Sequence, residues 1–217
     1  MSNSREKELA LEKAYIKVVR GKIYICIDNA VICSKNFSGV EKRNPYDPKE
    51  VVNSEGNRNF SIMLNQEAAD LISNFRLDDH PDKAFTVSVK VPPEGSEDPT
   101  PKIFMSIKVS YKYNIDQKGN KRPWSTNPII SQYSSKGKTE KDESNVDSID
   151  DVYIERADLI FTPGPYSIKA TGKKGLTAYL SQLNYKILEN ELNAKWDQDY
   201  STDGPEEFEQ FEEVPFA

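Results

Sequence analysis

Alternate residues from Lys102 to Lys112 form two faces of opposite chemistry if this segment is a β-strand. One face is apolar and suits a protein core: Ile103, Met105, Ile107, Val109 and Tyr111. The other face sets one ring among lysines and serines: Lys102, Phe104, Ser106, Lys108, Ser110 and Lys112. Lysines bind phosphates and a ring stacks on any base, so this face predicts a contact with a single nucleic-acid strand. The alternative is that a loop covers Phe104.

A second group of basic and aromatic residues follows in a loop. Its members are Tyr113, Lys118, Lys121, Arg122 and Trp124. Trp124 is a candidate for stacking on a second base, and the alternative is that it pins the loop to the body of the protein. Lys173 and Lys174 flank a glycine-rich turn and are further candidates for phosphate contacts, although a solvated hairpin tip would look the same.

Residue types suited to catalysis or metal binding are scarce. His80 is the only histidine, and it lies in a charged turn. Cys26 and Cys33 fall in one predicted strand, too far apart to bridge, so we expect reduced thiols. The sequence has no Cys/His cluster, glycine-rich phosphate loop or Ser/His pair. We therefore predict a binding protein with no enzymatic activity, metal or cofactor.

Charge is divided unevenly along the chain. The formal net charge is −6, yet the last 21 residues, Asp197–Ala217, hold eight acidic residues and no lysine or arginine. Residues 1–196 keep 29 basic and 27 acidic residues, and Lys83–Lys138 holds ten basic and four acidic ones. Because a nucleic-acid site needs only a local basic surface, an acidic chain can still contain one. We predict a locally basic body and a disordered acidic tail.

Apolar spacing predicts the order of the elements. Leu11, Tyr15, Val18 and Val19 follow helical spacing, so residues 1–21 are predicted to form a helical N-terminal extension. Asn65 is predicted to cap a helix over residues 66–76. Strands are predicted over residues 22–33 (bent near Asp28-Asn29), 60–64, 84–91, 102–113, 152–161 and 176–188.

The connections are long and polar. Residues 34–58 are predicted to be a loop, and residues 114–150 a polar insertion in which residues 134–148 are mobile. A turn is predicted at residues 162–167 and a short helix at 189–196. Five or six strands, one internal helix and long loops predict a mainly β, OB-fold-like barrel, with a sandwich as the alternative. We assign residues 22–196 to this domain and 197–217 to the tail.

Several short motifs follow one another along the chain in an order that is typical of a known family. They are Asn29-Ala30, Lys35-Asn36-Phe37-Ser38-Gly39, Gly56-Asn57-Arg58-Asn59-Phe60, and the segments 103–111, 154–161 and 175–183. This order resembles a family of bacteriophage single-stranded-DNA-binding proteins with an OB-fold. The resemblance implies that Lys35, Phe37, Arg58 and Phe60 are candidate DNA contacts. Alternation with Ile62 and Leu64 assigns Phe60 to the core, and Phe37 is either a loop anchor or a stacking ring.

The end of the chain resembles the acidic tip of bacterial single-stranded-DNA-binding proteins, which ends in Ile-Pro-Phe. The matching residues are Glu212, Glu213, Val214, Pro215 and Phe216, followed here by Ala217. This resemblance implies that the tail recruits replication or recombination proteins. A flexible polyanion would also compete with DNA for a basic groove.

The sequence as a whole predicts sequence-independent binding of single-stranded DNA in phage replication, recombination or repair. A protein-interaction adaptor or inhibitor of a host enzyme, and a virion assembly protein, are the alternatives. The charged N-terminus has no apolar signal core, and the chain has no run of apolar residues long enough for a membrane helix. We expect the protein in the host bacterial cytoplasm. The sequence does not determine its oligomeric state.

Overall fold

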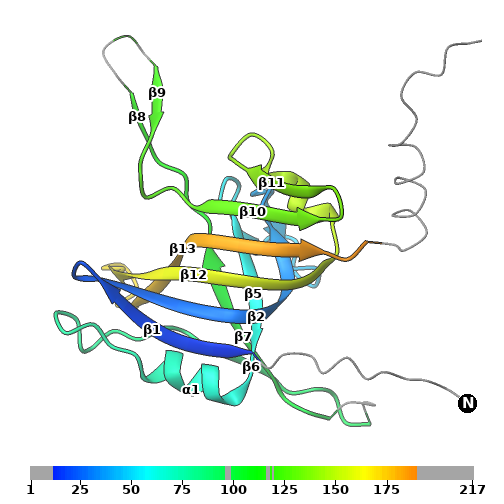
Figure 1. Cartoon of the computed structure of the whole chain (residues 1–217). Coiled ribbons are helices and arrows are strands. Elements are labelled where there is room, and N and C mark those ends of the chain that lie inside the picture. Colours follow the sequence, from blue (N-terminus) through cyan, green and yellow to red (C-terminus); the bar gives the residue numbers. More distant parts are fainter. Residues whose placement is uncertain (1–11, 96–98, 116–117, 119, 190–217) are drawn as a thin grey trace, which may run out of the picture.

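The computed structural model describes residues 12–95, 99–115, 118 and 120–189 (Figure 1). The predicted acidic tail and all but residue 189 of the predicted last helix lie outside these residues. Among the described residues, one α-helix, α1 (Gln66–Asn74), and one 3-10 helix, η1 (Val146–Asp151), accompany the strands. The strands are β1 (Lys13–Val19), β2 (Lys22–Asn36), β3 (Lys42–Arg43), β4 (Val51–Asn53), β5 (Asn59–Leu64), β6 (Ser88–Lys90), β7 (Lys102–Lys108), β8 (Tyr113–Ile115), β9 (Lys121–Pro123), β10 (Ile129–Ser134), β11 (Gly137–Lys141), β12 (Ile154–Ser167) and β13 (Lys174–Ile187).

Five of these strands close a ring. β2 pairs with β5 and β12, β7 pairs with β5 and β13, and β12 pairs with β13. Counted along the chain, the ring strands follow the order first, second, third, fifth, fourth, and only the β7–β13 pairing is parallel. The OB-fold is a five-stranded, partly open Greek-key arrangement. The prediction of a mainly β, OB-like fold with one internal helix is therefore confirmed.

Apolar side chains fill the inside of the ring. Alternate residues of the ring strands point inward, which buries them completely or nearly so. These residues include Ile25, Ile27, Phe60, Ile62, Met105, Ile107, Leu159, Phe161, Ala178 and Leu183. α1 packs against β1 and β5, with Ala68, Ala69 and Ile72 buried. As predicted, Asn65 caps this helix: its side-chain oxygen accepts the Ala68 N–H at 2.8 Å.

The predicted N-terminal helix is wrong for the described residues, which form β1 instead. β1 pairs with β2 along its whole length, with Ile16 opposite Ile25 and Val18 opposite Ile23. β-branched residues favour such pairing, and a partner strand outweighs a helical spacing of apolar residues. Arg20 (φ 51°) and Gly21 (φ 76°) form the two-residue turn, which needs positive φ at both positions if it follows the twist of a hairpin.

The predicted bend in β2 lies at Asn29, which has a φ of 58°. Asparagine tolerates this left-handed conformation better than most residues. Its N–H donates to the Asp158 carboxylate of β12 at 2.9 Å. The register between β2 and β12 shifts at the same place, between Ala157 and Leu159. The bend lets one long strand pair with β1 and β12 in its first half and with β5 in its second half.

The described part of the polar segment 114–150 contains more secondary structure than predicted. Residues 134–148, predicted to be mobile, belong largely to the hairpin of β10 and β11 and to η1. β10 adds to the edge of the ring by pairing in parallel with β13. Ile130, Val146 and Ile149 are buried against the core. A few apolar residues, spaced too irregularly to show a strand pattern, are therefore enough to order this segment.

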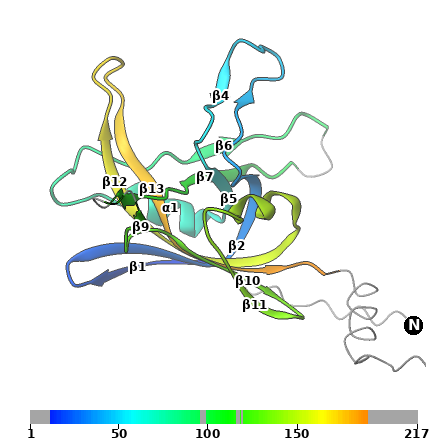
Figure 2. The ribbon, with the colours of Figure 1, turned by 90° about the horizontal axis from the view of Figure 1, so that it is seen from above.

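Other boundaries also differ from the predictions. Residues 162–167 are not a turn but the second half of β12, and the turn spans 168–173. The predicted loop 34–58 contains the small hairpin of β3 and β4. The predicted strands 84–91 and 102–113 are shorter in the structure, where they form β6 and β7. Phe85 makes an isolated parallel bridge with Leu176, and Tyr113 already belongs to β8. In Figure 2 the β3–β4 hairpin and the β12–β13 tip project from the same side of the body, with β5, β6 and β7 between them.

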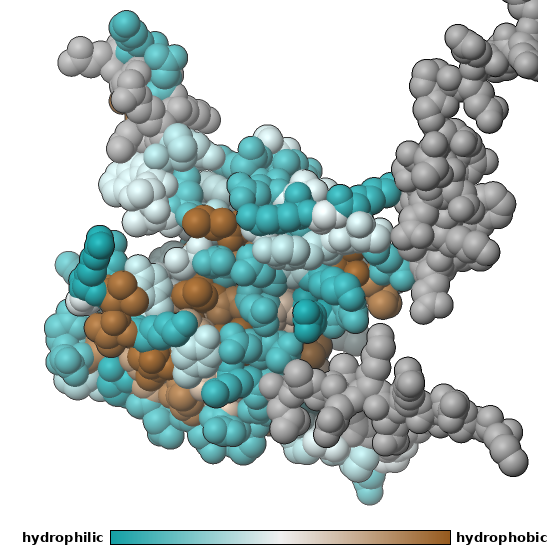
Figure 3. Space-filling model, in the orientation of Figure 1, coloured by the Kyte–Doolittle hydropathy of each residue, from teal (hydrophilic) through white to brown (hydrophobic). Residues whose placement is uncertain are grey.

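The face drawn in Figure 3 is mainly hydrophilic, with apolar side chains gathered toward the β1–β2 hairpin. Ile16, Val18 and Val19 of β1 are exposed there. Among the described residues, no helix is long and apolar enough to cross a membrane.

Candidate nucleic-acid interface

The two faces of β7 differ as the alternation predicts. Met105 and Ile107 point into the core and are 3% and 0% exposed. Lys102 and Ser106 on the other face are exposed, and Phe104 and Lys108 are partly exposed. The ring of Phe104 is therefore accessible at the surface between two lysines, as an aromatic stacking site requires.

Neighbouring strands extend this face on both sides of Phe104. Phe104 lies opposite Met63 of β5 and opposite Ser88 of β6, and Met63 lies opposite Val31 of β2. Cross-strand neighbours on one face are about 5 Å apart, so Val31, Met63 and Phe104 form one apolar row. We call the outer face of β5, β6 and β7, together with Val31, the platform. Its polar and basic residues are Ser61, Ser88, Lys90, Lys102, Ser106 and Lys108.

Two hairpins flank the platform (Figure 2). Residues 37–58 connect the first and second ring strands, and residues 168–173 connect the fourth and fifth. In OB-folds, the face of the second and third strands and these two loops bind oligonucleotides. Both hairpins contribute exposed basic side chains here: Lys42, Arg43, Lys49, Lys169, Lys173 and Lys174.

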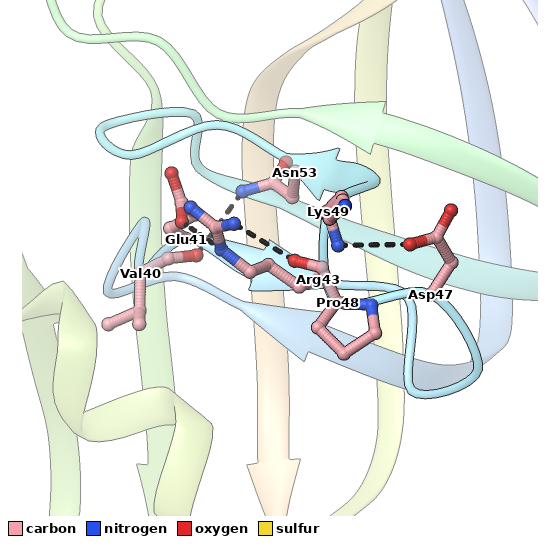
Figure 4. A network of polar contacts seen from close by, with 7 residues as sticks. All are labelled: Val40, Glu41, Arg43, Asp47, Pro48, Lys49 and Asn53. Atoms are coloured by element: carbon pink, nitrogen blue, oxygen red, sulfur yellow. Dashed lines mark hydrogen bonds and ion pairs between the residues drawn. The ribbon is translucent and has the colours of Figure 1, made fainter.

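Polar contacts hold the first hairpin in shape (Figure 4). Arg43 donates to Glu41 at 2.7 Å and to the backbone oxygen of Pro48 at 2.9 Å. The Lys49 N–H donates to the Asp47 carboxylate at 3.1 Å. These contacts fix the conformation of the loop and leave Lys49 exposed on it. The guanidinium of Arg43 is already paired with Glu41 within the hairpin.

The second hairpin is tied to the segment before β6. Lys174 pairs with Asp82 at 2.6 Å, and the hydrogen bond from Lys174 lowers the pKa of that carboxyl group. Both side chains are about half exposed, so the pair orients the hairpin more than it stabilises the fold.

A model of the family described as "Putative phage ssDNA-binding domain" matches residues 16–207. The chain belongs to this family of phage ssDNA-binding domains. The family was expected from the order of the motifs, and this expectation is confirmed. No curated protein matches the chain.

Solved structures of phage proteins are similar at low sequence identity. The single-stranded DNA-binding protein from bacteriophage Enc34 is 12% identical, with a TM-score of 0.41 over 82% of this chain and 92% of that one. The structure of the Enc34 protein in complex with ssDNA gives 12% identity and a TM-score of 0.40, over 83% and 98%. The gp2.5 protein of bacteriophage T7 gives 11% and 0.34, over 91% and 100%.

The motif residue Phe37 is part of the core of this phage domain. It is 0% exposed, and its ring stacks on Phe60 with centroids 5.1 Å apart and planes 14° apart. The N–H groups of Phe37 and Ser38 donate to the Asp150 carboxylate at 2.8 and 2.9 Å. Its prediction as a DNA contact is therefore wrong, and the loop-anchor alternative describes it.

Lys35 and Arg58 are likewise engaged in internal contacts. The Lys35 ammonium donates to the backbone oxygens of Ile149 (2.9 Å) and Val152 at the end of η1. Burial lowers its pKa, although the nearby carboxylates of Asp150 and Asp151 oppose the shift. The Lys35 ammonium thus makes a structural contact, and its predicted phosphate contact stays a prediction.

Arg58, which directly precedes β5, links this end of the strand to the segment after β11. It pairs with Glu143 at 3.0 Å, and its guanidinium carbon lies 5.7 Å from the centre of the Tyr111 ring. Within the described residues, its Nε is buried without a hydrogen-bond partner. Arg58, like Lys35, thus makes structural contacts, and its predicted phosphate contact stays a prediction.

The remaining predicted residues lie outside the platform, in the arm formed by β8 and β9 and at its base. Tyr113 lies in β8, and Lys121 and Arg122 lie in β9. Lys112 and Trp124 lie at the base of the arm, where the Trp124 N–H donates to the Lys112 oxygen at 3.0 Å. The predicted site residues therefore do not form one cluster.

Sequence reasoning missed the partners of Phe104 on the platform. The alternation that assigns Phe60, Ile62 and Leu64 to the core also turns Met63 outward, so this signal was available. The pairing of Met63 with Phe104 and Val31 depends on sheet register, which the sequence does not show. In the described part of the chain, no group of three or more His, Cys, Asp or Glu residues could hold a metal ion.

The substitution Phe37→Leu separates a core role from a DNA-binding role. We expect the free energy of unfolding to fall by about 1 kcal/mol, because the stacked ring pair is lost. Affinity of the folded protein for oligothymidine should not change, because the side chain is fully buried. Chemical denaturation and fluorescence anisotropy measure the two quantities. Val40→Ala, at an exposed position of the same loop, is the control, and lost affinity at unchanged stability would contradict the assignment.

Proposed function

We propose that this phage domain binds single-stranded DNA independently of sequence, along the platform and between its two flanking hairpins. The observation that supports the proposal most is the outer face of β7, where Phe104 is accessible between Lys102 and Lys108. This face belongs to the second and third ring strands, the usual nucleic-acid face of an OB-fold.

The chemistry of the platform suits a strand of any sequence. Each lysine that neutralises a phosphate releases condensed counterions, which favours binding in proportion to the number of contacts. A base stacked on Phe104 contributes about 1–3 kcal/mol, and every base has a face to stack. Ser61 and Ser106 lie opposite each other beside the apolar row and offer hydroxyl groups to the backbone of the strand.

The biological setting is part of the proposal. A protein that covers exposed single strands would act in phage replication, recombination or repair, within the cytoplasm of the infected bacterium. We propose no catalytic step for it. The binding domain comprises residues 22–196 together with β1, and residues 197–217 are an acidic tail that recruits replication or recombination proteins.

The substitution Phe104→Leu tests the stacking role. It keeps an apolar side chain in the row with Met63 but removes the ring, so affinity for oligothymidine should fall by about 1–3 kcal/mol. Equilibrium titration by fluorescence anisotropy measures the loss. Tyr153→Leu removes an exposed ring outside the platform (81% exposed) and should leave affinity unchanged. Equal affinities for both variants would refute stacking on Phe104.

The salt dependence of binding tests the lysines. For about five phosphate contacts we expect the slope of log K against log salt to be about −3 to −4. Lys108→Ala should reduce its magnitude by about 0.7, the value for one contact to a single strand. Lys138→Ala is the matched control, because this exposed lysine of β11 pairs with Glu140. A slope that changes equally in both variants would indicate a general charge effect instead.

The charge of the acidic tail allows a further test of the lysines. We propose that residues 197–217 compete with DNA for the lysines, since eight acidic residues and no basic ones occupy this segment. Such competition is electrostatic and acts over about 30 Å at 0.01 M salt but only about 8 Å at 0.15 M.

Deletion of residues 197–217 should therefore tighten binding of single-stranded DNA, and most at low salt. Titrations of the full-length and truncated proteins at two salt concentrations measure the effect. Deletion of residues 1–11, in which Arg5 and Lys7 balance Glu6 and Glu8, is the control and should change little. Unchanged affinity after tail deletion at both salt concentrations would exclude the competition.

A further inference from the structure

A trough with a volume of about 710 Å³ lies where the chain leaves β7. Three aromatic side chains line it, contributed by three different parts of the fold: Tyr24 of β2, Tyr179 of β13 and Trp124 at the base of the arm. Trp124 is 45% exposed, and the two tyrosines are partly exposed. In Figures 1 and 2 the arm and the β1–β2 tip lie on the same side of the ring. Residues of both line the trough, among them Trp124 at the base of the arm and Lys22 next to the β1–β2 turn.

The charge of the side chains that line the trough favours the binding of an anionic nucleic-acid strand. The exposed lysines Lys22 and Lys112 line it, together with one carboxylate, Asp79. Asp79 lies 3.7 Å from the imidazole of His80. Aromatic rings beside lysines form the combination that binds single strands without reading their sequence.

The position of Tyr179 is set by the strand beside it. A Cβ atom placed on Gly164 of β12 would lie 2.4 Å from Cε2 of the Tyr179 ring. The ring therefore packs directly over the glycine backbone and is held in place before any ligand arrives. A ring that is already ordered loses little conformational entropy when a base stacks on it.

The trough is continuous with the platform. Lys108, the last residue of β7, pairs with Tyr179 across the parallel β7–β13 pairing. Ser110 and Lys112, the next outward residues after Lys108, both line the trough. A single DNA strand that runs along the outward side chains of β7 and past Lys108 therefore reaches the trough, with polar or basic side chains beside it all the way.

We propose that the trough is a second segment of the DNA path, in which Tyr179 and Trp124 stack on bases while Lys22 and Lys112 contact phosphates. The proposal rests on the platform being the first segment. Short oligonucleotides then occupy the platform alone, and longer ones extend into the trough. Binding-site length is thus determined by two aromatic surfaces joined at Lys108.

Oligothymidines of two lengths test this in the full-length protein. Lengths of about 8 and about 16 nucleotides fall within the range for one OB-fold. Trp196→Phe leaves Trp124 as the only tryptophan of the chain, so its fluorescence reports on the trough. We expect the longer oligonucleotide to quench Trp124 and the shorter one to leave it unchanged. Tyr179→Leu should weaken binding of the longer oligonucleotide by about fivefold or more and spare the shorter one.

Two further variants separate the possible outcomes. Trp124→Leu, at a more exposed position, should repeat the length-dependent loss even if Tyr179→Leu reduces stability. Phe104→Leu should weaken both lengths. If Phe104→Leu weakens both while Tyr179→Leu and Trp124→Leu change neither, the trough is excluded and the platform stands. If the trough variants weaken both lengths equally, the trough is not an extension. If no variant matters, the proposed function fails as well.

Discussion

The parallel pairing of β7 with β13 is short, yet it closes the ring. Ile107 lies opposite Ala178, and Lys108 lies opposite Tyr179. The first pair points inward and is buried, whereas the second points outward at the surface. Because side chains alternate along a strand, a shift of one residue in this pairing would exchange the two. The same pairing therefore determines what the core contains and what the surface offers to a nucleic acid.

The family motifs of this chain act mainly inside the fold. Phe37 stacks on Phe60, Asp150 accepts the N–H groups at the start of the first hairpin, and Lys35 holds the end of η1. Arg58 extends the same role to the segment after β11 through Glu143. These contacts attach a polar segment, which has few apolar residues of its own, to the ring. The motifs thus identify the family, and the contacts of their residues stabilise the fold that carries the proposed interface.

Structure could be predicted from the sequence where it depends on the residues of a single segment. The alternation of β7, the cap at Asn65 and the bend at Asn29 all depend on local chemistry, and all were predictable. The strand β1 was not, because its helical spacing is outweighed by pairing with β2. The apolar row of the candidate site was only partly predictable for the same reason, because it depends on pairing between distant segments. Phe104 could be found from its own strand, but its neighbours Met63 and Val31 depend on the register of three strands, which is a long-range property.

Gly164 and Tyr179 have a consequence for the variation of this family. A side chain at position 164 and a ring at position 179 compete for one space, since even a methyl group on Gly164 would overlap the ring. The two positions are therefore expected to vary together among relatives, with glycine kept wherever the ring is kept. Covariation between them in an alignment would trace the aromatic surface through sequences too diverged for their motifs to be compared.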